Sequence, residues 1–167
     1  ALQEAKERCT RYVHEFLTPE GTFRQTGLLL VGPPGSGKTH LAAAVLGALI
    51  RRYSLRGRFV DFSSLINQIQ STFDPASPES KHDILDPVME AELLVIDELG
   101  AQNPTPFVKD ILYLVLNHRY THRLPTIFTS NFRLELATNS NLADTDLLER
   151  RLTPPLVSRL YEMAEVI

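Results

Sequence analysis

The sequence has almost no cysteine and no long apolar run, and both absences narrow its class. Its 167 residues include one cysteine, Cys9, so no internal disulfide framework or cysteine metal cluster can form. No apolar stretch reaches the roughly 18 residues of a membrane span. The amino-terminal residues also lack the apolar centre of a signal peptide. We therefore expect a cytoplasmic protein without a membrane partner.

The sequence also has no excess of positive charge. Seventeen Lys and Arg residues face 20 Asp and Glu residues, which gives a net charge of −3. This argues against a broadly basic surface for nucleic acid, although a local basic groove remains open because steering depends on where the charge lies. Of the five histidines, only His118 and His122 share helical spacing, and no glutamate between them completes a zinc-protease motif. We interpret the histidines as structural or surface residues.

The most informative segment is GPPGSGKT at residues 32–39, which follows the apolar run Leu28 to Val31. This order of strand, glycine-rich loop and helix is typical of a Walker A phosphate loop. Glycines allow the backbone N–H groups of such a loop to point inward around a triphosphate, and the following helix N-terminus favours the same anion. The alternative, a glycine-rich turn with an exposed lysine, leaves the flanking pattern unexplained. The segment predicts a nucleoside triphosphate site.

Within this segment the chemistry assigns separate roles. Lys38 is expected to reach the β- and γ-phosphates, and the Thr39 hydroxyl is expected to hold Mg²⁺. The residues predicted to contact ATP are Gly32, Pro33, Pro34, Gly35, Ser36, Gly37, Lys38, Thr39 and His40.

A second apolar run, Leu93 to Ile96, ends in the acids Asp97 and Glu98. Four buried aliphatic residues followed by two carboxylates are typical of a Walker B strand. Asp97 would join Thr39 at Mg²⁺, and Glu98 would orient the attacking water. A core strand that simply ends in an acidic loop is the alternative. The second acid favours an ATPase, because a nucleotide switch or a kinase can act without it.

Two further residues are candidates for contact with the γ-phosphate. Asn131 ends the apolar stretch PTIFTSN at residues 125–131 and could sense that phosphate, with Thr129 and Ser130 as neighbours. Arg159 stands among apolar residues near the end of the chain and could act as an arginine finger in a neighbouring subunit. An ordinary salt bridge or surface position is the alternative for Arg159, and Arg150 and Arg151 compete for the same role.

Apolar strands alternate with helical segments along the whole chain, which predicts an α/β fold with a parallel sheet covered on both faces. Such sheets bind ligands at the carboxyl ends of their strands, where the motifs above fall. Strands are expected at 27–31, 57–62, 93–96, 125–130 and from 164. Helices are expected at 1–17, 38–53, from a cap at Ser63 or Ser64 to 73, at 84–91, at 106–119, and in pieces from 131 to Tyr161.

Together these segments resemble the bacterial helicase-loader family (DnaC and DnaI) and the related IstB transposition ATPases of the AAA+ class. The resemblance is carried by residues 27–45, 91–102, 117–120, 125–131 and 156–160, thus by most of the chain from Gly27 on. It implies a three-layer P-loop NTPase fold, with Asn131 as sensor 1 and Arg159 as a finger that acts in trans through self-assembly. The role of Arg119, within the 117–120 segment, is left open.

The resemblance implies two domain segments, an amphipathic helix and linker at 1–26 and an AAA+ ATPase core at 27–167. The family's helicase-binding region is not recognisable in the first, and its C-terminal lid would follow the second, so we expect the lid to be absent or truncated. The leading hypothesis is an ATPase that loads the replicative DNA helicase, with single-stranded DNA as a second ligand. Alternatives are a transposition helper and, more remotely, a small-molecule kinase.

Overall fold

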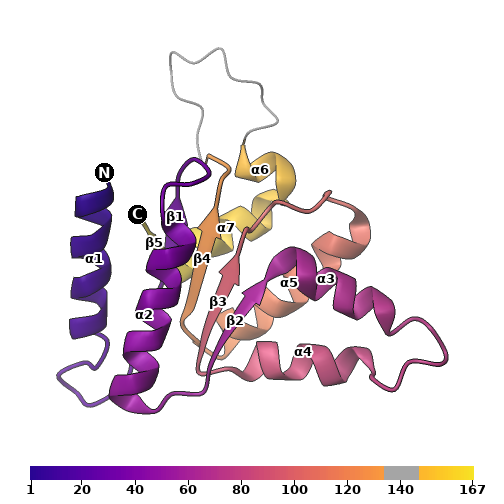
Figure 1. Ribbon diagram of the computed structural model, residues 1–167, viewed down its shortest axis with the longest axis horizontal. Helices are drawn as coiled ribbons and strands as arrows, with labels where there is room; N and C mark the ends of the chain where they lie inside the picture. Colours follow the sequence, from indigo (N-terminus) through magenta and orange to yellow (C-terminus); the bar gives the residue numbers. More distant parts are fainter. Residues whose placement is uncertain (134–146) are drawn as a thin grey trace.

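The computed structural model describes residues 1–133 and 147–167, and a parallel sheet forms its centre (Figure 1). The order of the five strands in the described part is β2-β3-β4-β1-β5, and every neighbouring pair is parallel. The strands are β1 (Gly27–Val31), β2 (Gly57–Asp61), β3 (Leu93–Asp97), β4 (Thr126–Ser130) and β5 (Ala164–Val166). The predicted α/β fold with a central parallel sheet is confirmed.

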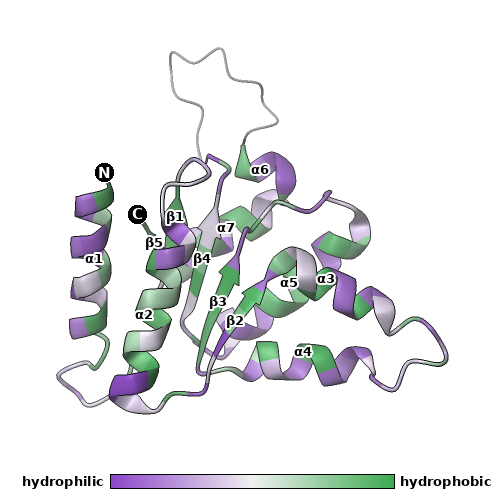
Figure 2. Ribbon diagram, in the orientation of Figure 1, coloured by the Kyte–Doolittle hydropathy of each residue, from purple (hydrophilic) through white to green (hydrophobic). Residues whose placement is uncertain are grey.

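Helices cover both faces of this sheet, because successive strand side chains point to opposite faces. Leu28 and Leu30 pack in one apolar cluster with α1 (Leu2–His14) and α2 (Lys38–Tyr53). Leu29 packs in the other, with α3 (Phe62–Ser71), α4 (Lys81–Glu90), α5 (Pro106–Thr121) and α7 (Pro154–Met163). The short helix α6 (Leu148–Arg151) precedes α7. The helices alternate hydrophobic and hydrophilic residues along their length, whereas β3 is almost entirely hydrophobic (Figure 2).

Several element boundaries differ from the sequence prediction. The helix predicted to be capped by Ser63 or Ser64 begins at Phe62, because the Asp61 carboxylate accepts the Ser64 N–H at 2.7 Å and so caps it. The same helix ends at Ser71 rather than at residue 73. The helix predicted from residue 84 begins at Lys81, since Ser80 and Asp83 form a reciprocal capping box. Of the helical pieces predicted between 131 and 161, α6 and α7 are found, and residues 134–146 lie outside the described part.

The centre of the sheet depends on close backbone contact at Gly27. A Cβ atom at this position would lie 1.7 Å from the carbonyl oxygen of Thr126 in the neighbouring strand β4. Glycine is therefore required where β1 and β4 begin, and the approach of the two strands sets the register that brings Val31 opposite Ser130 at their far ends.

The N-terminal helix packs onto the core that begins at Gly27. Cys9, Tyr12 and Phe16 are buried, and burial raises the pKa of the Cys9 thiol. The Tyr12 hydroxyl donates to the Thr26 carbonyl at 2.8 Å, while Arg8 pairs with Glu165 in β5. These contacts attach α1 to the residue before β1 and to the edge strand β5. No helix of the described residues combines the length and the apolar character that crossing a membrane requires.

Candidate functional site

The glycine-rich loop lies between β1 and α2, at the carboxyl end of the sheet (Figure 1). Gly35 and Gly37 have φ angles of 77° and 90°, which other residues rarely adopt. Gly37 is the N-cap of α2, and no side chain caps the helix. The first helical amides are therefore left without intrahelical acceptors, in a turn that contains no acidic residue. Unpaired N–H groups at a helix N-terminus fit an anionic phosphate.

Lys38 folds back over this loop. Its ammonium donates to the Pro33 carbonyl at 2.7 Å and to the Ser36 hydroxyl at 3.3 Å. Partial burial lowers the pKa of Lys38, and the carboxylates of Asp97 and Glu98 oppose that shift. An ammonium held by two neutral oxygens can exchange them for phosphate oxygens, which bind it more strongly because they carry charge.

Thr39 and Asp97 meet as their motifs predict. The Thr39 hydroxyl donates to Asp97 Oδ1 at 2.9 Å across 58 positions of sequence, and Asp97 is 6% exposed. The described residues contain no group of three or more His, Cys, Asp or Glu that could hold a metal. A hydroxyl and one carboxylate suit Mg²⁺, which keeps several waters and takes further ligands from substrate phosphates. The donor set therefore fits Mg²⁺ bound together with a nucleotide.

Thr129 connects the two acids, a role that the sequence analysis did not assign to it. Its buried hydroxyl donates to Asp97 Oδ1 at 2.5 Å and accepts the Glu98 N–H at 2.9 Å. Its carbonyl accepts the Leu99 N–H at 2.8 Å. Sequence reasoning named Thr129 only as a neighbour of Asn131, although a polar residue inside an apolar strand was a signal for such a role.

Glu98 and Asn131 lie exposed next to this cluster. Glu98 has a φ angle of 58°, which is unusual for a residue with a side chain, and its N–H is held by Thr129. Asn131 directly follows β4, whose last residue, Ser130, accepts the Gly32 N–H at 3.2 Å. The fold thus places both residues at the strand ends beside the phosphate loop. Their roles in positioning water and sensing phosphate remain predictions.

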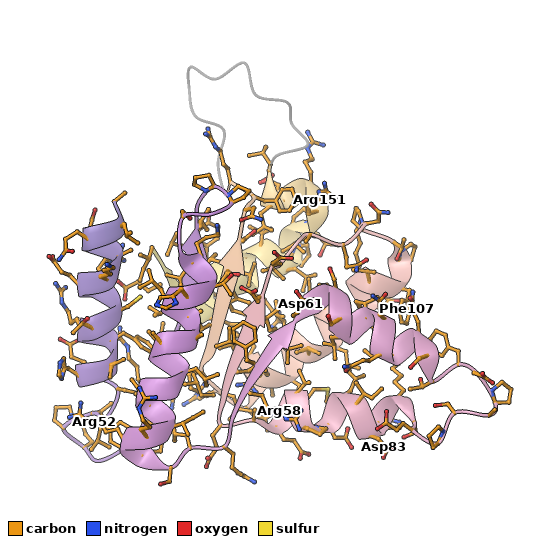
Figure 3. All side chains as sticks on the ribbon, viewed as in Figure 1. Arg52, Arg58, Asp61, Asp83, Phe107 and Arg151 are labelled. Atoms are coloured by element: carbon orange, nitrogen blue, oxygen red, sulfur yellow. The ribbon has the colours of Figure 1, made fainter. Side chains whose placement is uncertain are left out.

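The arginines separate into three environments. Arg159 lies on α7 with its guanidinium carbon 4.4 Å from the centre of the Tyr120 ring, away from the phosphate loop of its own chain. Arg151, labelled in Figure 3, lies near the carboxyl ends of the strands, 4.6 Å from the Phe132 ring. Arg119 is fully buried and is hydrogen-bonded to main-chain carbonyls. Its role is therefore structural.

A cavity of about 510 Å³ adjoins the phosphate loop on the side of α1. Apolar side chains of Leu2, Ala5, Leu41 and Ile167 line it beside Lys38 and the loop. Its volume is in the range of small-molecule sites, roughly 300–1,000 Å³. Sequence reasoning missed this cavity because its walls come from the first helix, the loop and the last described residue, which are far apart in the chain.

Removal of the Thr129 hydroxyl tests the link between the acids. We expect Thr129→Val to lower the free energy of unfolding by about 1–2 kcal/mol, because Asp97 and the Glu98 N–H each lose a hydrogen-bond partner. Thr129→Ser keeps the hydroxyl and is the matched control. Denaturant unfolding measures the difference, and parental stability of the valine variant would contradict this role.

Comparison with known proteins connects this geometry to a family. The model of the family described as IstB-like ATP binding protein matches residues 3–167. The Geobacillus stearothermophilus protein named "Insertion sequence IS5376 putative ATP-binding protein" is 33% identical over 155 residues, 90% of this chain and 59% of that protein. The replicative helicase loader DnaC of Escherichia coli K12 is 30% identical over 134 residues, 78% of this chain and 51% of that protein.

Among solved structures, the crystal structure of the DnaC helicase loader superposes with a TM-score of 0.79 at 32% identity. The match covers 98% of this chain and 87% of that one. The chain spans about half the length of the curated relatives that it matches.

Proposed function

We propose, since this chain belongs to the family of IstB-like ATP binding proteins, that it binds ATP with Mg²⁺ and hydrolyses it. Lys38 and the unpaired amides at the start of α2 hold the phosphates, and Thr39 and Asp97 hold Mg²⁺, which neutralises phosphate charge. Glu98 orients the water, and Asn131 senses the γ-phosphate. The apolar cavity beside the loop takes the nucleoside.

The observation that carries this proposal is the hydrogen bond between Thr39 and Asp97. Two motifs separated by 58 positions meet at 2.9 Å, and Glu98 follows Asp97 directly at the open end of β3. A glycine-rich turn without function would not require a hydroxyl, a buried carboxylate and a second exposed carboxylate at one point. A small-molecule kinase would not require Glu98 for water activation.

We further propose that ATP turnover by this chain serves the loading of the replicative DNA helicase, with single-stranded DNA as second ligand. The similarity to a helicase loader in sequence and in structure supports this proposal. Glu98 within the segment IDELG also resembles the loader pattern. The second candidate is an ATP-dependent helper of a transposase, favoured by the insertion-sequence relative that matches 90% of this chain.

Partner capture and DNA binding by the full-length protein separate these candidates. In the presence of a non-hydrolysable ATP analogue, we expect it to retain a hexameric replicative helicase and not a transposase. Fluorescence anisotropy should show tighter binding to single-stranded than to duplex oligonucleotides, with strong salt dependence. A single subunit should bind feebly, because the net charge is −3.

Lys38→Ala is the control for nucleotide dependence, since it should lose both interactions without losing the fold. A preference for duplex DNA together with transposase capture would favour the transposition helper. Absence of DNA binding in every nucleotide state would contradict the proposed second ligand.

A further inference from the structure

The surroundings of Arg159 give a role to Tyr120, a residue of the 117–120 segment to which the sequence motifs assign no function. Arg159 and Glu162 lie on α7, and both contact Tyr120 in the last turn of α5. The Arg159 guanidinium lies over the ring face at 4.4 Å from the ring centre, while the Tyr120 hydroxyl donates to Glu162 Oε2 at 2.5 Å. The ring face of Tyr120 thus contacts Arg159, and the hydroxyl of the same tyrosine is bonded to Glu162.

This cluster lies at the edge of the sheet where the strands begin, opposite the phosphate loop. Tyr120 follows Arg119, whose guanidinium donates to the Pro125 carbonyl just before β4. From Pro125 to Thr129, which contacts Asp97, the chain advances four residues along β4, or ~13 Å. Arg159 is therefore placed away from the nucleotide site of its own chain, as an arginine that acts in a neighbouring subunit must be.

Tyr120 and Arg159 are accessible to solvent, and the backbone beside Tyr120 is held in place by Arg119. Tyr120 is 38% exposed, and Arg159 is partly exposed, so the pair lies at the surface. Arg159 forms no ion pair with a carboxylate in residues 1–133 and 147–167, so its contact with the aromatic ring leaves its charge unneutralised. The buried Arg119 fixes the backbone beside Tyr120 through its hydrogen bonds.

We propose that Tyr120 is the positioning residue of Arg159: its ring, oriented by Glu162, presents the guanidinium to the nucleotide site of a second copy of this chain. The inference rests on the proposed trans role of Arg159. A guanidinium confined to one face of a fixed ring has fewer orientations to lose when it enters that site. Glu162 keeps the ring face directed at Arg159 because it holds the hydroxyl at the ring's far end.

ATP hydrolysis by the full-length protein, measured over a range of protein concentrations, tests this inference. Arg159→Ala is expected to remove the rise of specific activity with concentration. Tyr120→Leu should reproduce most of that loss, at least about tenfold in kcat, with unchanged ATP affinity. Tyr120→Phe, which keeps the ring, should retain more activity than Tyr120→Leu. The double variant should be no worse than Arg159→Ala alone, because both changes act through one group.

Mixing experiments add a readout that a merely structural role would not move. Lys38→Ala subunits should lack their own nucleotide site but keep the Arg159 and Tyr120 pair, so adding them to Tyr120→Leu subunits should restore turnover. Subunits carrying both Lys38→Ala and Arg159→Ala should not restore it. Tyr113→Leu is the matched control, because Tyr113 is an exposed tyrosine of the same helix without a contact to Arg159.

Two contradictory outcomes are distinguishable. If Arg159→Ala hydrolyses ATP with the parental concentration dependence, the trans role of Arg159 and the inference both fail. If Arg159→Ala is impaired while Tyr120→Leu and Glu162→Ala behave as the parent does, only the inference on Tyr120 fails. Glu162→Ala changes a surface position without altering the ring, so this arm remains decisive if Tyr120→Leu folds poorly.

Discussion

Glu98→Gln is expected to bind ATP with parental affinity and to hydrolyse it about 100-fold more slowly, or slower still. Glutamine has nearly the same shape but lacks the carboxylate charge with which Glu98 orients the attacking water. The backbone that directs this side chain is held by Thr129, so the substitution should leave its direction unchanged. Nucleotide titration gives the affinity, and phosphate release gives the turnover.

Lys38→Ala is expected to show the opposite pattern to Glu98→Gln, with a loss of affinity for ATP. It removes the ammonium that donates to the Pro33 carbonyl, and with it the main positive charge facing the phosphates.

Glu20→Gln, at an exposed turn, is the control for Glu98→Gln, because it also removes one carboxylate, and it should change neither ATP affinity nor turnover. Parental hydrolysis by Glu98→Gln would show that the catalytic assignment of Glu98 is wrong.

Arg119→Met is expected to lower the free energy of unfolding by about 3–5 kcal/mol. Arg119 is fully buried, and its guanidinium donates to the carbonyls of Val88, Met89 and Ala91 at 3.2, 3.1 and 2.8 Å. It also donates to Pro125 and Thr126 at 2.9 and 2.7 Å. Burial lowers the pKa of Arg119 to about 9, so the group remains charged at neutral pH. Methionine would remove all five of these hydrogen bonds.

Denaturant unfolding measures this loss. Arg119→Lys should recover only a part of the stability, because one ammonium cannot span carbonyls from α4 and from the start of β4. Arg58→Met, at an exposed position of β2 labelled in Figure 3, is the matched control and should stay within about 0.5 kcal/mol of the parent. Stability of Arg119→Met equal to that of the control would contradict the structural role.

The loop and the acidic strand end could be predicted from sequence because each is a contiguous segment with its own chemistry. Gly35, Gly37 and Lys38 act through neighbouring backbone, so the order of residues contains the information. Arg119 could not be assigned in this way. Three of its acceptors are main-chain carbonyls 28 to 31 positions earlier. Because every residue has a main-chain carbonyl, the sequence contains no sign of these partners.

The predicted starts of α3 and α4 were wrong because they depend on contacts of capping side chains. Asp61 lies in β2 as predicted, but its carboxylate also caps α3, so Phe62, which was predicted as the last strand residue, begins the helix. The capping box of Ser80 and Asp83 has a recognisable spacing that the prediction overlooked. The partnership of Tyr120 with Arg159 joins two helices separated by the whole of β4, and neither local sequence contains a sign of it.

The positive φ angle at Glu98 has a consequence for which substitutions this site tolerates. An unfavourable backbone angle of this kind costs of order 1 kcal/mol or more and persists only where surrounding contacts impose it, as the N–H bond to Thr129 does here. This backbone angle fixes the direction in which the Cβ atom of Glu98 leaves the main chain. Glycine would suit the local geometry better than glutamate does, so the conformation itself gives no reason for a carboxylate at residue 98.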